Sequence, residues 1–167
     1  MSRRTHISQL LERHEPFSEL EGVHLDRMRA LCAVDGDPFD RAHWAPGHFT
    51  ASAFVLSPDE QSLLLIFHGK LKRWLQPGGH VEPGDRDIIA AAMREVAEET
   101  GVSHVEVIGE GLFDVDVHVL PARKGDPEHC HFDARVLLRA TSLDFAAGSD
   151  AEDGKWVRLD DVSALES

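Results

Sequence analysis

The sequence predicts an α/β fold, a layered arrangement with several strands, one central helix and further helices at both ends of the chain. Three observations predict it. Apolar residues recur at helical spacing over residues 4–33, they alternate or form short strand-like runs from His48 onward, and one amphipathic helical segment, 87–100, interrupts these strands. The length of 167 residues suits a single domain with a full core.

The composition excludes several classes of protein. Hydrophobic residues make up 42% and charged residues 28% of the chain, which is typical of a globular protein. The formal net charge of −13 argues against a nucleic-acid partner, whereas divalent cations would still let the chain bind a phosphorylated small molecule. No apolar run reaches the ~18 residues of a membrane span, no secretory signal is seen, and the two cysteines form no disulfide framework. We therefore expect a cytoplasmic protein with no membrane partner.

The N-terminal region predicts two helices. Apolar residues at helical spacing form two groups, Ile7, Leu10 and Leu11, and then Leu25, Met28, Leu31 and Cys32. Glu15 and Pro16 are expected to separate the two helices, and a turn is expected over 35–38. We treat residues 1–45 as a helical extension packed on a domain that spans 46–167. Three roles are open for it: covering the sheet, shaping a substrate pocket, or forming the contact of a homodimer.

The remaining elements follow from alternation and turn signals. Strands are predicted over 48–55, 63–67, 105–120, 132–138 and 155–159, with a short closing helix over 160–165. The segment 105–120 suits one long strand or two short ones. Regular structure is expected to stop at Pro77, Gly78 and Gly79.

The clearest helix spans 87–100. Its apolar stripe consists of Ile89, Ala92, Met93 and Val96. Asp85 or Asp87 can cap its N-terminus, and Gly101 can end it in the left-handed conformation.

The same helix carries three glutamates, Glu95, Glu98 and Glu99, on one face beside the apolar stripe, because they are related by i, i+3 and i+4. Like charges this close raise one another's pKa unless something compensates. Arg94 can partly neutralise Glu98 at i+4. A divalent cation would compensate better, since hard cations such as Mg²⁺ prefer carboxylate oxygen and water. The pattern therefore indicates a metal-binding face rather than a merely solvated one.

The stretch from Gly79 to Val102 resembles the Nudix box, G-x5-E-x7-R-E-U-x-E-E-x-G-U with U aliphatic. The matching residues are Gly79, Arg94, Glu95, Val96, Glu98, Glu99, Gly101 and Val102. The chain departs from the box in two ways: its first acid is Asp85 rather than Glu, and eight residues rather than seven separate that acid from Arg94. The extra residue belongs to the loop or the first helical turn, which leaves open whether Asp85 or Asp87 takes the place of the first acid.

This resemblance implies a mixed β-sheet sandwiched between helices, with 46–167 as the Nudix domain. It also implies hydrolysis, dependent on Mg²⁺ or Mn²⁺, of a nucleoside diphosphate linked to another group. Metal binding is assigned by the resemblance to the carbonyl of Gly79 and to Glu95, Glu98 and Glu99. Arg94 would orient these glutamates by ion pairing.

The group that accepts the proton of the attacking water is not fixed by the sequence. Glu95 or Glu98 is one choice. The other is an acid on a distant loop, for which the resemblance points to Glu152 and Asp153, just before Trp156.

Further residues are candidates for substrate contact, namely Trp74, His80, Arg73, His131 and Asp133. His129, His131, Asp133 and Arg135 alternate along one predicted strand and share a face, which suits either a row of substrate contacts or a separate transition-metal site. Trp74 is a candidate for stacking on a base, His80 for facing the phosphates, and the basic run that contains Arg73 for contacting them.

Two other functions are compatible with this fold: a Nudix-fold diphosphate isomerase and a non-catalytic nucleotide-binding sensor. An isomerase of this kind often uses a catalytic cysteine, but Cys32 falls in the helical extension and Cys130 in the histidine-rich strand. A sensor commonly loses box glutamates, and none is lost here. A nucleoside triphosphate, a nucleotide sugar or a related pyrophosphate remain open as substrates. The absence of any tyrosine weakens the case for a dinucleoside polyphosphate hydrolase.

Overall fold

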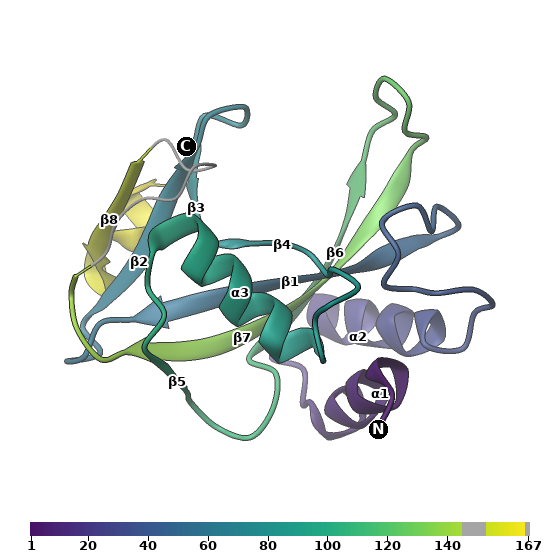
Figure 1. Cartoon of the computed structure of the whole chain (residues 1–167), viewed down its shortest axis with the longest axis horizontal. Coiled ribbons are helices and arrows are strands. Elements are labelled where there is room, and N and C mark those ends of the chain that lie inside the picture. Colours follow the sequence, from purple (N-terminus) through teal and green to yellow (C-terminus); the bar gives the residue numbers. More distant parts are fainter. Residues whose placement is uncertain (145–152, 166–167) are drawn as a thin grey trace.

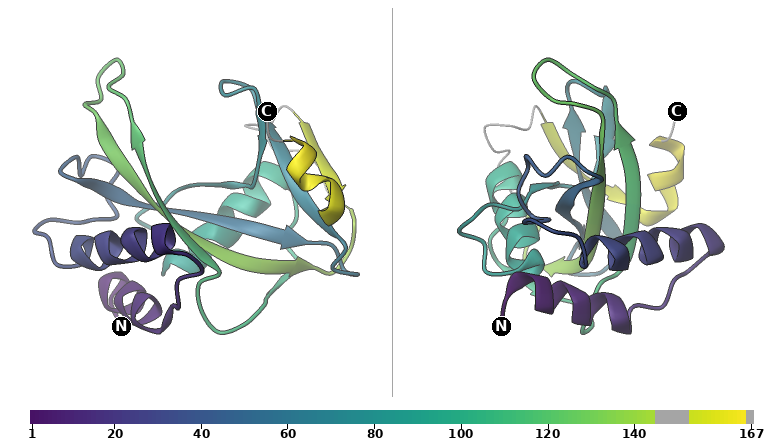
Figure 2. Two further views of the ribbon diagram at one scale, coloured as in Figure 1. Left: turned by 180° about the vertical axis from the view of Figure 1, so that it is seen from behind. Right: turned by 90° about the vertical axis from the view of Figure 1, so that its right-hand side faces the viewer.

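The computed structural model describes residues 1–144 and 153–165 and confirms the predicted class, a curved mixed sheet with helices packed against it (Figure 1). The elements in chain order are α1 (Arg3–Arg13), α2 (Glu19–Leu31), β1 (Gly47–Leu56), β2 (Ser62–His68), β3 (Arg73–Leu75), β4 (Gly78–His80), α3 (Ile88–Thr100), β5 (Val105–Val107), β6 (Asp114–Leu120), β7 (His129–Ala140), β8 (Asp153–Arg158) and the 3₁₀ helix η1 (Leu159–Leu165). In the right-hand view of Figure 2, α3 and η1 lie on opposite sides of the strands.

β1 is the central strand. One edge pairs in parallel with β7 along its whole length, from Gly47↔Cys130 to Leu56↔Arg139. The other edge is shared: β4 pairs with residues 50–52, and β2 joins only at Leu56↔Leu63. β2 therefore leaves β1 where β4 takes its place, and the β2–β3 and β6–β7 hairpins rise on either side of β4 (Figure 1).

β4 was not expected. The prediction that regular structure stops at 77–79 was wrong, because Gly78, Gly79 and His80 form a short strand against β1. A Cβ added to Gly78 would lie 2.4 Å from the Cβ of Ser52, so only glycine lets the two backbones approach this closely. The open choice over 105–120 is settled as two strands, β5 and β6.

α3 matches the predicted helix closely. Asp87 caps its N-terminus, with the side chain accepting a hydrogen bond from the Ala90 N–H, and Gly101 ends it at φ 77°. Its buried apolar residues are Ile88, Ala91, Ala92 and Val96. The buried face of the helix is therefore rotated relative to the predicted apolar stripe. Ile89 and Met93, which were predicted to lie in that stripe, are only partly buried and pack at the edge of the core.

The N-terminal helices share the core of the sheet. The predicted break is confirmed, because α1 ends at Arg13 and α2 begins at Glu19 after the capping residue Ser18. The buried apolar residues of both helices belong to the same cluster as Phe49 of β1 and Phe132 of β7. In the described part of the chain, no helix combines the length and the apolar character that crossing a membrane requires.

A buried glutamate fixes α2 to the sheet. Oε2 of Glu21 accepts a hydrogen bond from the backbone N–H of Val115 in β6 (3.1 Å) and lies 3.0 Å from Nε2 of His14. Oε1 accepts a bond from the backbone N–H of Phe17. Burial by itself would raise the pKa of Glu21, but these bonds and one from Asp114 outweigh burial and lower the pKa to about 2. An ionised carboxylate thus joins α2, the loop before it and β6.

Replacing Glu21 with Gln is expected to lower the free energy of unfolding at neutral pH by about 1–3 kcal/mol, because buried N–H groups lose an ionised acceptor. Folding lowers the Glu21 pKa from 4.5 to about 2. The stabilising contribution is therefore present above the unfolded-state value and is lost as the pH falls from there toward the folded-state value, so the difference between variant and parent should shrink over that range. Urea denaturation followed by circular dichroism measures both effects. Glu12→Gln, exposed on α1, is the control; equal effects of the two substitutions would contradict the prediction.

Candidate active site

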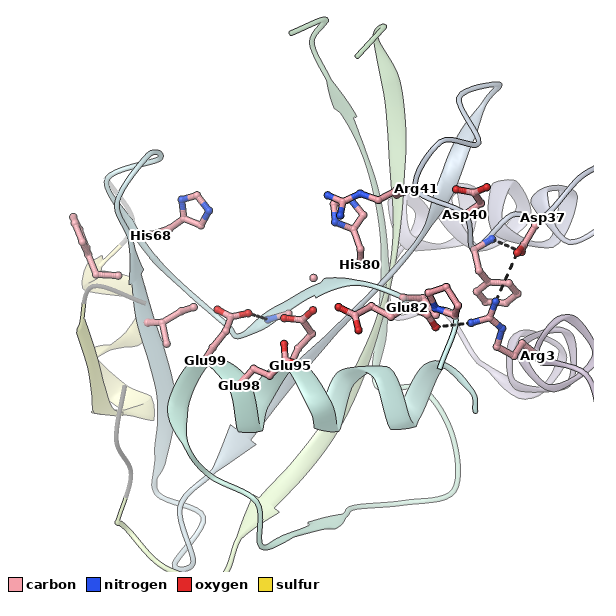
Figure 3. A pocket seen from close by; sticks show the side chains of 17 residues that line it. Arg3, Asp37, Asp40, Arg41, His68, His80, Glu82, Glu95, Glu98 and Glu99 are labelled. Carbon is pink, nitrogen blue, oxygen red and sulfur yellow. Dashed lines mark hydrogen bonds and ion pairs between the residues drawn. The ribbon is translucent and has the colours of Figure 1, made fainter. Parts of the chain in front are cut away.

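A cavity of about 600 Å³ opens over α3 and β4 (Figure 3). Its floor is formed by β4 and by the three glutamates of α3. One wall belongs to β2, through Ile66, Phe67 and His68. The opposite wall comes from residues that precede β1, namely Arg3, Asp37, Phe39, Asp40 and Arg41.

A second cavity, of about 380 Å³, adjoins the first. Residues that line both are Ile66, His68, Gly78, Gly79, His80 and Glu99. The rest of its wall includes Thr50 and Ser52 of β1, His118 of β6, and His131 and Asp133 of β7. Because β4 borders both cavities, they form one cleft, in which Glu95 and Glu98 line only the first cavity and His118 and His131 only the second.

Arg94 connects α3 to the loop before it. Its Nε and Nη2 donate to the two carboxylate oxygens of Asp85 at 2.8 and 2.9 Å. Nη1 donates to Glu95 Oε1 (3.1 Å) and Glu98 Oε2 (3.0 Å), and Nη2 also donates to the carbonyl of His80 (2.9 Å). Bidentate guanidinium–carboxylate pairs are strong and directional. Arg94 therefore holds two of the three glutamates in place relative to β4.

Asp85, not Asp87, is the acid that pairs with Arg94, since Asp87 is occupied as the cap of α3. Asp85 is buried, which by itself would raise its pKa. The hydrogen bonds from Arg94 and from the backbone N–H of Glu82 outweigh burial and lower the pKa. An ionised aspartate thus fills the position of the first box acid, and the extra residue is accommodated before the helix begins at Ile88.

The three glutamates have different environments. Glu99 is buried, and its Oε1 accepts a hydrogen bond from the Gly78 N–H at 3.2 Å. Burial raises the pKa of Glu95, although hydrogen bonds with Glu99 and Arg94 oppose this shift. The side chain of Glu98 is 50% exposed. All three line the first cavity and lie together beside β4 (Figure 3).

This set of oxygen donors fits a divalent cation. Arg94 brings one positive charge to four neighbouring carboxylates, those of Glu82, Asp85, Glu95 and Glu98, so the face stays negative. A Cβ added to Gly79 would lie 2.6 Å from Glu95 Oε1, so the backbone of β4 approaches that carboxylate as only glycine allows. Carboxylate and backbone carbonyl oxygens are the donors that Mg²⁺ and Mn²⁺ prefer.

The predicted substrate-contact residues divide into two groups. Those that line the cleft are His80, His131 and Asp133. Trp74 and Arg73, on β3, line neither of its two cavities. Trp74 packs edge-on against Phe67, with centroids 5.4 Å apart, and Lys155 Nζ lies 4.2 Å from its ring centroid. Its aromatic surface is thus used in packing beside β2 and β8.

Asp133 takes part in a buried hydrogen-bond network. It accepts bonds from Thr50 Oγ1 (3.0 Å), Ser52 Oγ (2.7 Å) and Arg135 Nε (3.0 Å). The bonds from Thr50 and Ser52 join β7 to β1 beside the second cavity, so Asp133 supports the floor of the cleft.

The two distant acids are placed differently. Glu152 lies outside the described residues. Asp153 begins β8, where its backbone is paired with that of Phe67, a residue that lines the first cavity. Their role as proton acceptors stays a prediction.

Sequence reasoning missed the cations that the N-terminal extension brings to the cleft. Arg3 Nη1 donates to the carbonyl of Glu82 (2.9 Å), and its guanidinium carbon lies 4.9 Å from the ring centroid of Phe39. Arg41 lines the same cavity. No local pattern indicates these residues, because they precede the box by many residues and reach it only through tertiary packing.

A family model, the NUDIX domain, matches residues 46–167. The chain belongs to the NUDIX family. The match confirms the family that the box residues indicated, and it begins one residue before β1.

Several NUDIX relatives and structures resemble the chain. It is 33% identical over 105 residues to an RNA pyrophosphohydrolase of Caulobacter vibrioides, a match that covers 55% of this chain and only 59% of that relative. It is 28% identical over 103 residues to the bis(5′-nucleosyl)-tetraphosphatase (asymmetrical) of Rattus norvegicus, covering 62% of this chain and 67% of that one. The crystal structure of a NUDIX-family hydrolase from Clostridium perfringens superposes with a TM-score of 0.51 and 26% identity, over 70% of this chain and 83% of that one.

Replacing Gly79 with Ala is expected to weaken Mn²⁺ binding by about tenfold or more, because the added Cβ would displace the carboxylate of Glu95. Gly84→Ala is the matched control, since a Cβ there would have no atom within 4 Å. Electron paramagnetic resonance of free Mn²⁺ during a titration gives both dissociation constants. Parental affinity in Gly79→Ala would contradict the predicted role of Glu95 as a metal ligand.

Proposed function

We propose that this NUDIX protein is a divalent-metal-dependent pyrophosphohydrolase. Its substrate would be a nucleoside diphosphate linked to another group, such as a nucleoside triphosphate or a nucleotide sugar. The observation that carries the proposal is the set of three carboxylates on one face of α3, two of them bonded to Arg94, at the floor of a cavity. The names of both curated relatives, which are those of phosphoric-anhydride hydrolases, support it.

Mg²⁺ or Mn²⁺ would be held by Glu95, Glu98, Glu99 and the carbonyl of Gly79. Bound there, a divalent ion supplies charge neutralisation for a pyrophosphate and a lowered pKa for its coordinated water. The protein contributes position: Arg94 fixes two of the carboxylates, and the Gly78 N–H fixes the third. Phosphoryl transfer depends mainly on such positioning and electrostatics, without a covalent protein nucleophile.

Glu95 is our first choice for the group that accepts the proton of the attacking water. Burial raises its pKa, which brings its basicity closer to neutral pH than that of an exposed carboxylate. Glu98 is the second choice, because its half-exposed side chain reaches the cavity. Both carboxylates accept a hydrogen bond from Nη1 of Arg94.

The phosphates of the substrate would meet cations at the rim of the cleft. Arg3 and Arg41 line the first cavity, and Lys70 and Arg123 line the second. Their placement on both sides of β4 would allow a chain of phosphates to cross the carboxylate face between positive charges. This supports a phosphorylated small molecule as the partner. Homodimerisation, a cytoplasmic location and the exclusion of nucleic acid stay predictions.

The isomerase alternative is less well supported. Neither Cys32 nor Cys130 lines the two cavities of the cleft, and burial raises the pKa of the Cys32 thiol. The sensor alternative would leave the three glutamates without a catalytic use. Hydrolysis accounts for all of them.

Glu98→Gln is expected to lower kcat by about 100-fold or more while leaving the unfolding curve unchanged, because the half-exposed side chain keeps its shape and loses only its charge. The assay uses Mg²⁺ or Mn²⁺ with nucleoside di- and triphosphates, nucleotide sugars, a dinucleoside tetraphosphate and 5′-triphosphorylated RNA. EDTA should abolish turnover of whichever substrate is cleaved. Glu12→Gln is the control, and full turnover in Glu98→Gln would refute the metal assignment.

Activity is expected to rise from acid toward alkaline pH. Burial raises the pKa of Glu95 in the metal-free chain, so acid pH favours its neutral form, which competes with cation binding and accepts no proton. The attacking water must lose a proton as well. A profile of kcat/KM against pH at saturating Mg²⁺ measures this, and an optimum at acid pH would count against the mechanism.

A further inference from the structure

Three histidines meet on the other side of β4 from the glutamates. His48 of β1, His80 of β4 and His131 of β7 each offer one ring nitrogen, and these nitrogens all lie within 4.8 Å of one another. The sheet register explains the meeting. His48 is paired with His131 in the β1–β7 ladder, and His80 is paired with Thr50, two residues along β1 from His48. Since alternate residues of a strand share a face, the three rings point to one face of the sheet.

His48 has an unused nitrogen. The residue is only 1% exposed, and its Nδ1 lies 3.4 Å from the carbonyl oxygen of His43. Its Nε2 is buried and has no hydrogen-bond partner within residues 1–144 and 153–165. An unpaired polar atom in a native interior is costly and requires an explanation. A histidine whose Nδ1–H is directed to a backbone carbonyl presents the Nε2 lone pair, as metal-binding histidines commonly do.

The three rings form one cluster. The ring centroid of His48 lies 5.2 Å from that of His80 and 4.9 Å from that of His131, and the centroids of His80 and His131 are 5.2 Å apart. Crowding of buried imidazoles disfavours their charged forms, and an uncharged imidazole offers its nitrogen lone pair to a metal.

We propose that His48, His80 and His131 form a second metal site, which binds Zn²⁺ or a similar borderline transition metal. Tetrahedral zinc with Zn–N bonds of about 2.0–2.1 Å requires ligand nitrogens about 3.3 Å apart, which small rotations of the three rings can reach. Nitrogen donors distinguish this site from the carboxylate face, which suits Mg²⁺ or Mn²⁺.

Three protein ligands leave one coordination position open, as in catalytic zinc sites. His80 and His131 both line the second cavity, which also carries Lys70 and Arg123. A water molecule or a phosphate oxygen can reach the metal from that cavity. A metal bound here would add positive charge to the cleft, besides that of the arginine and lysine side chains and of the Mg²⁺ or Mn²⁺ held by the glutamates. It would lie on the far side of β4 from the glutamates.

This ligand set differs from the one that the spacing His129-x-His131-x-Asp133 indicates. Asp133 is already bonded to Thr50, Ser52 and Arg135. His129 is not among the residues whose ligand nitrogens lie within 4.8 Å of one another, and its ring stacks on His48 with centroids 5.1 Å apart. His129 therefore supports His48 from the side, and only His131 of that pattern belongs to the site.

Zn²⁺ binding by the full chain tests the proposal. The protein is prepared without an affinity tag, stripped with a chelator, and titrated with Zn²⁺ against a chromogenic zinc indicator. We expect about one tight equivalent, and affinity weakened by about tenfold to 100-fold in His131→Gln and in His80→Gln. His104→Gln, an exposed histidine outside the cluster, is the matched control and should bind like the parent.

Glu98→Gln separates this proposal from the hydrolase proposal, because it should lose turnover with Mg²⁺ yet keep the affinity for Zn²⁺. Zinc affinity that survives both histidine substitutions, or that disappears in Glu98→Gln, would overturn the histidine site. X-ray absorption at the zinc edge is measured on the parental protein, so its result does not depend on whether a variant folds. It should show three imidazole ligands, and a shell made of oxygen alone would also overturn the proposal.

Discussion

The ion pair between Arg94 and Asp85 is the interaction on which the cleft depends. Three glutamates within little more than one helical turn repel one another, and α3 carries them only because a guanidinium lies among them. The planar fork of that group is itself held by the bidentate bond to Asp85 and by the carbonyl of His80. Arg94 thus connects the helix, the loop before it and β4, and it positions the carboxylates of Glu95 and Glu98, while the Gly78 N–H positions that of Glu99.

The second constraint is the divided edge of β1. β4 occupies that edge where β2 has left it, and it fits there because Gly78 carries no side chain to meet Ser52. The same strand meets the carboxylate of Glu95 through Gly79 and ends in His80, which borders both cavities. The three residues of β4 therefore lie between the carboxylate oxygens of α3 on one side and the histidine nitrogens on the other.

The sequence was most informative where the determinants are local. α3, its caps and the common face of its glutamates follow from spacing within a few residues, and the structure reproduces them. The choice between Asp85 and Asp87 required tertiary contacts, since both can cap the helix and only one reaches Arg94. The strand at Gly78 was missed because glycine usually signals a turn, and its backbone partner in β1 is distant in sequence. Trp74 was predicted to stack on a base because it is a large aromatic residue. Its ring instead packs against Phe67, a contact that the sequence does not indicate. His48 carries no sequence signal at all, and it matters because the parallel pairing with β7 places it beside His131.

The attachment of α2 through Glu21 also bears on the cleft. The family match begins at residue 46, so Arg3, Phe39 and Arg41 lie outside it although they form a wall of the first cavity. The glutamates of α3 and the cationic wall thus belong to separate parts of the chain, which meet through tertiary packing and through hydrogen bonds such as that from Arg3 to the Glu82 carbonyl. If the proposed hydrolase function holds, changes in the residues before β1 would alter which phosphorylated substrates fit the cleft without changing the carboxylates of α3.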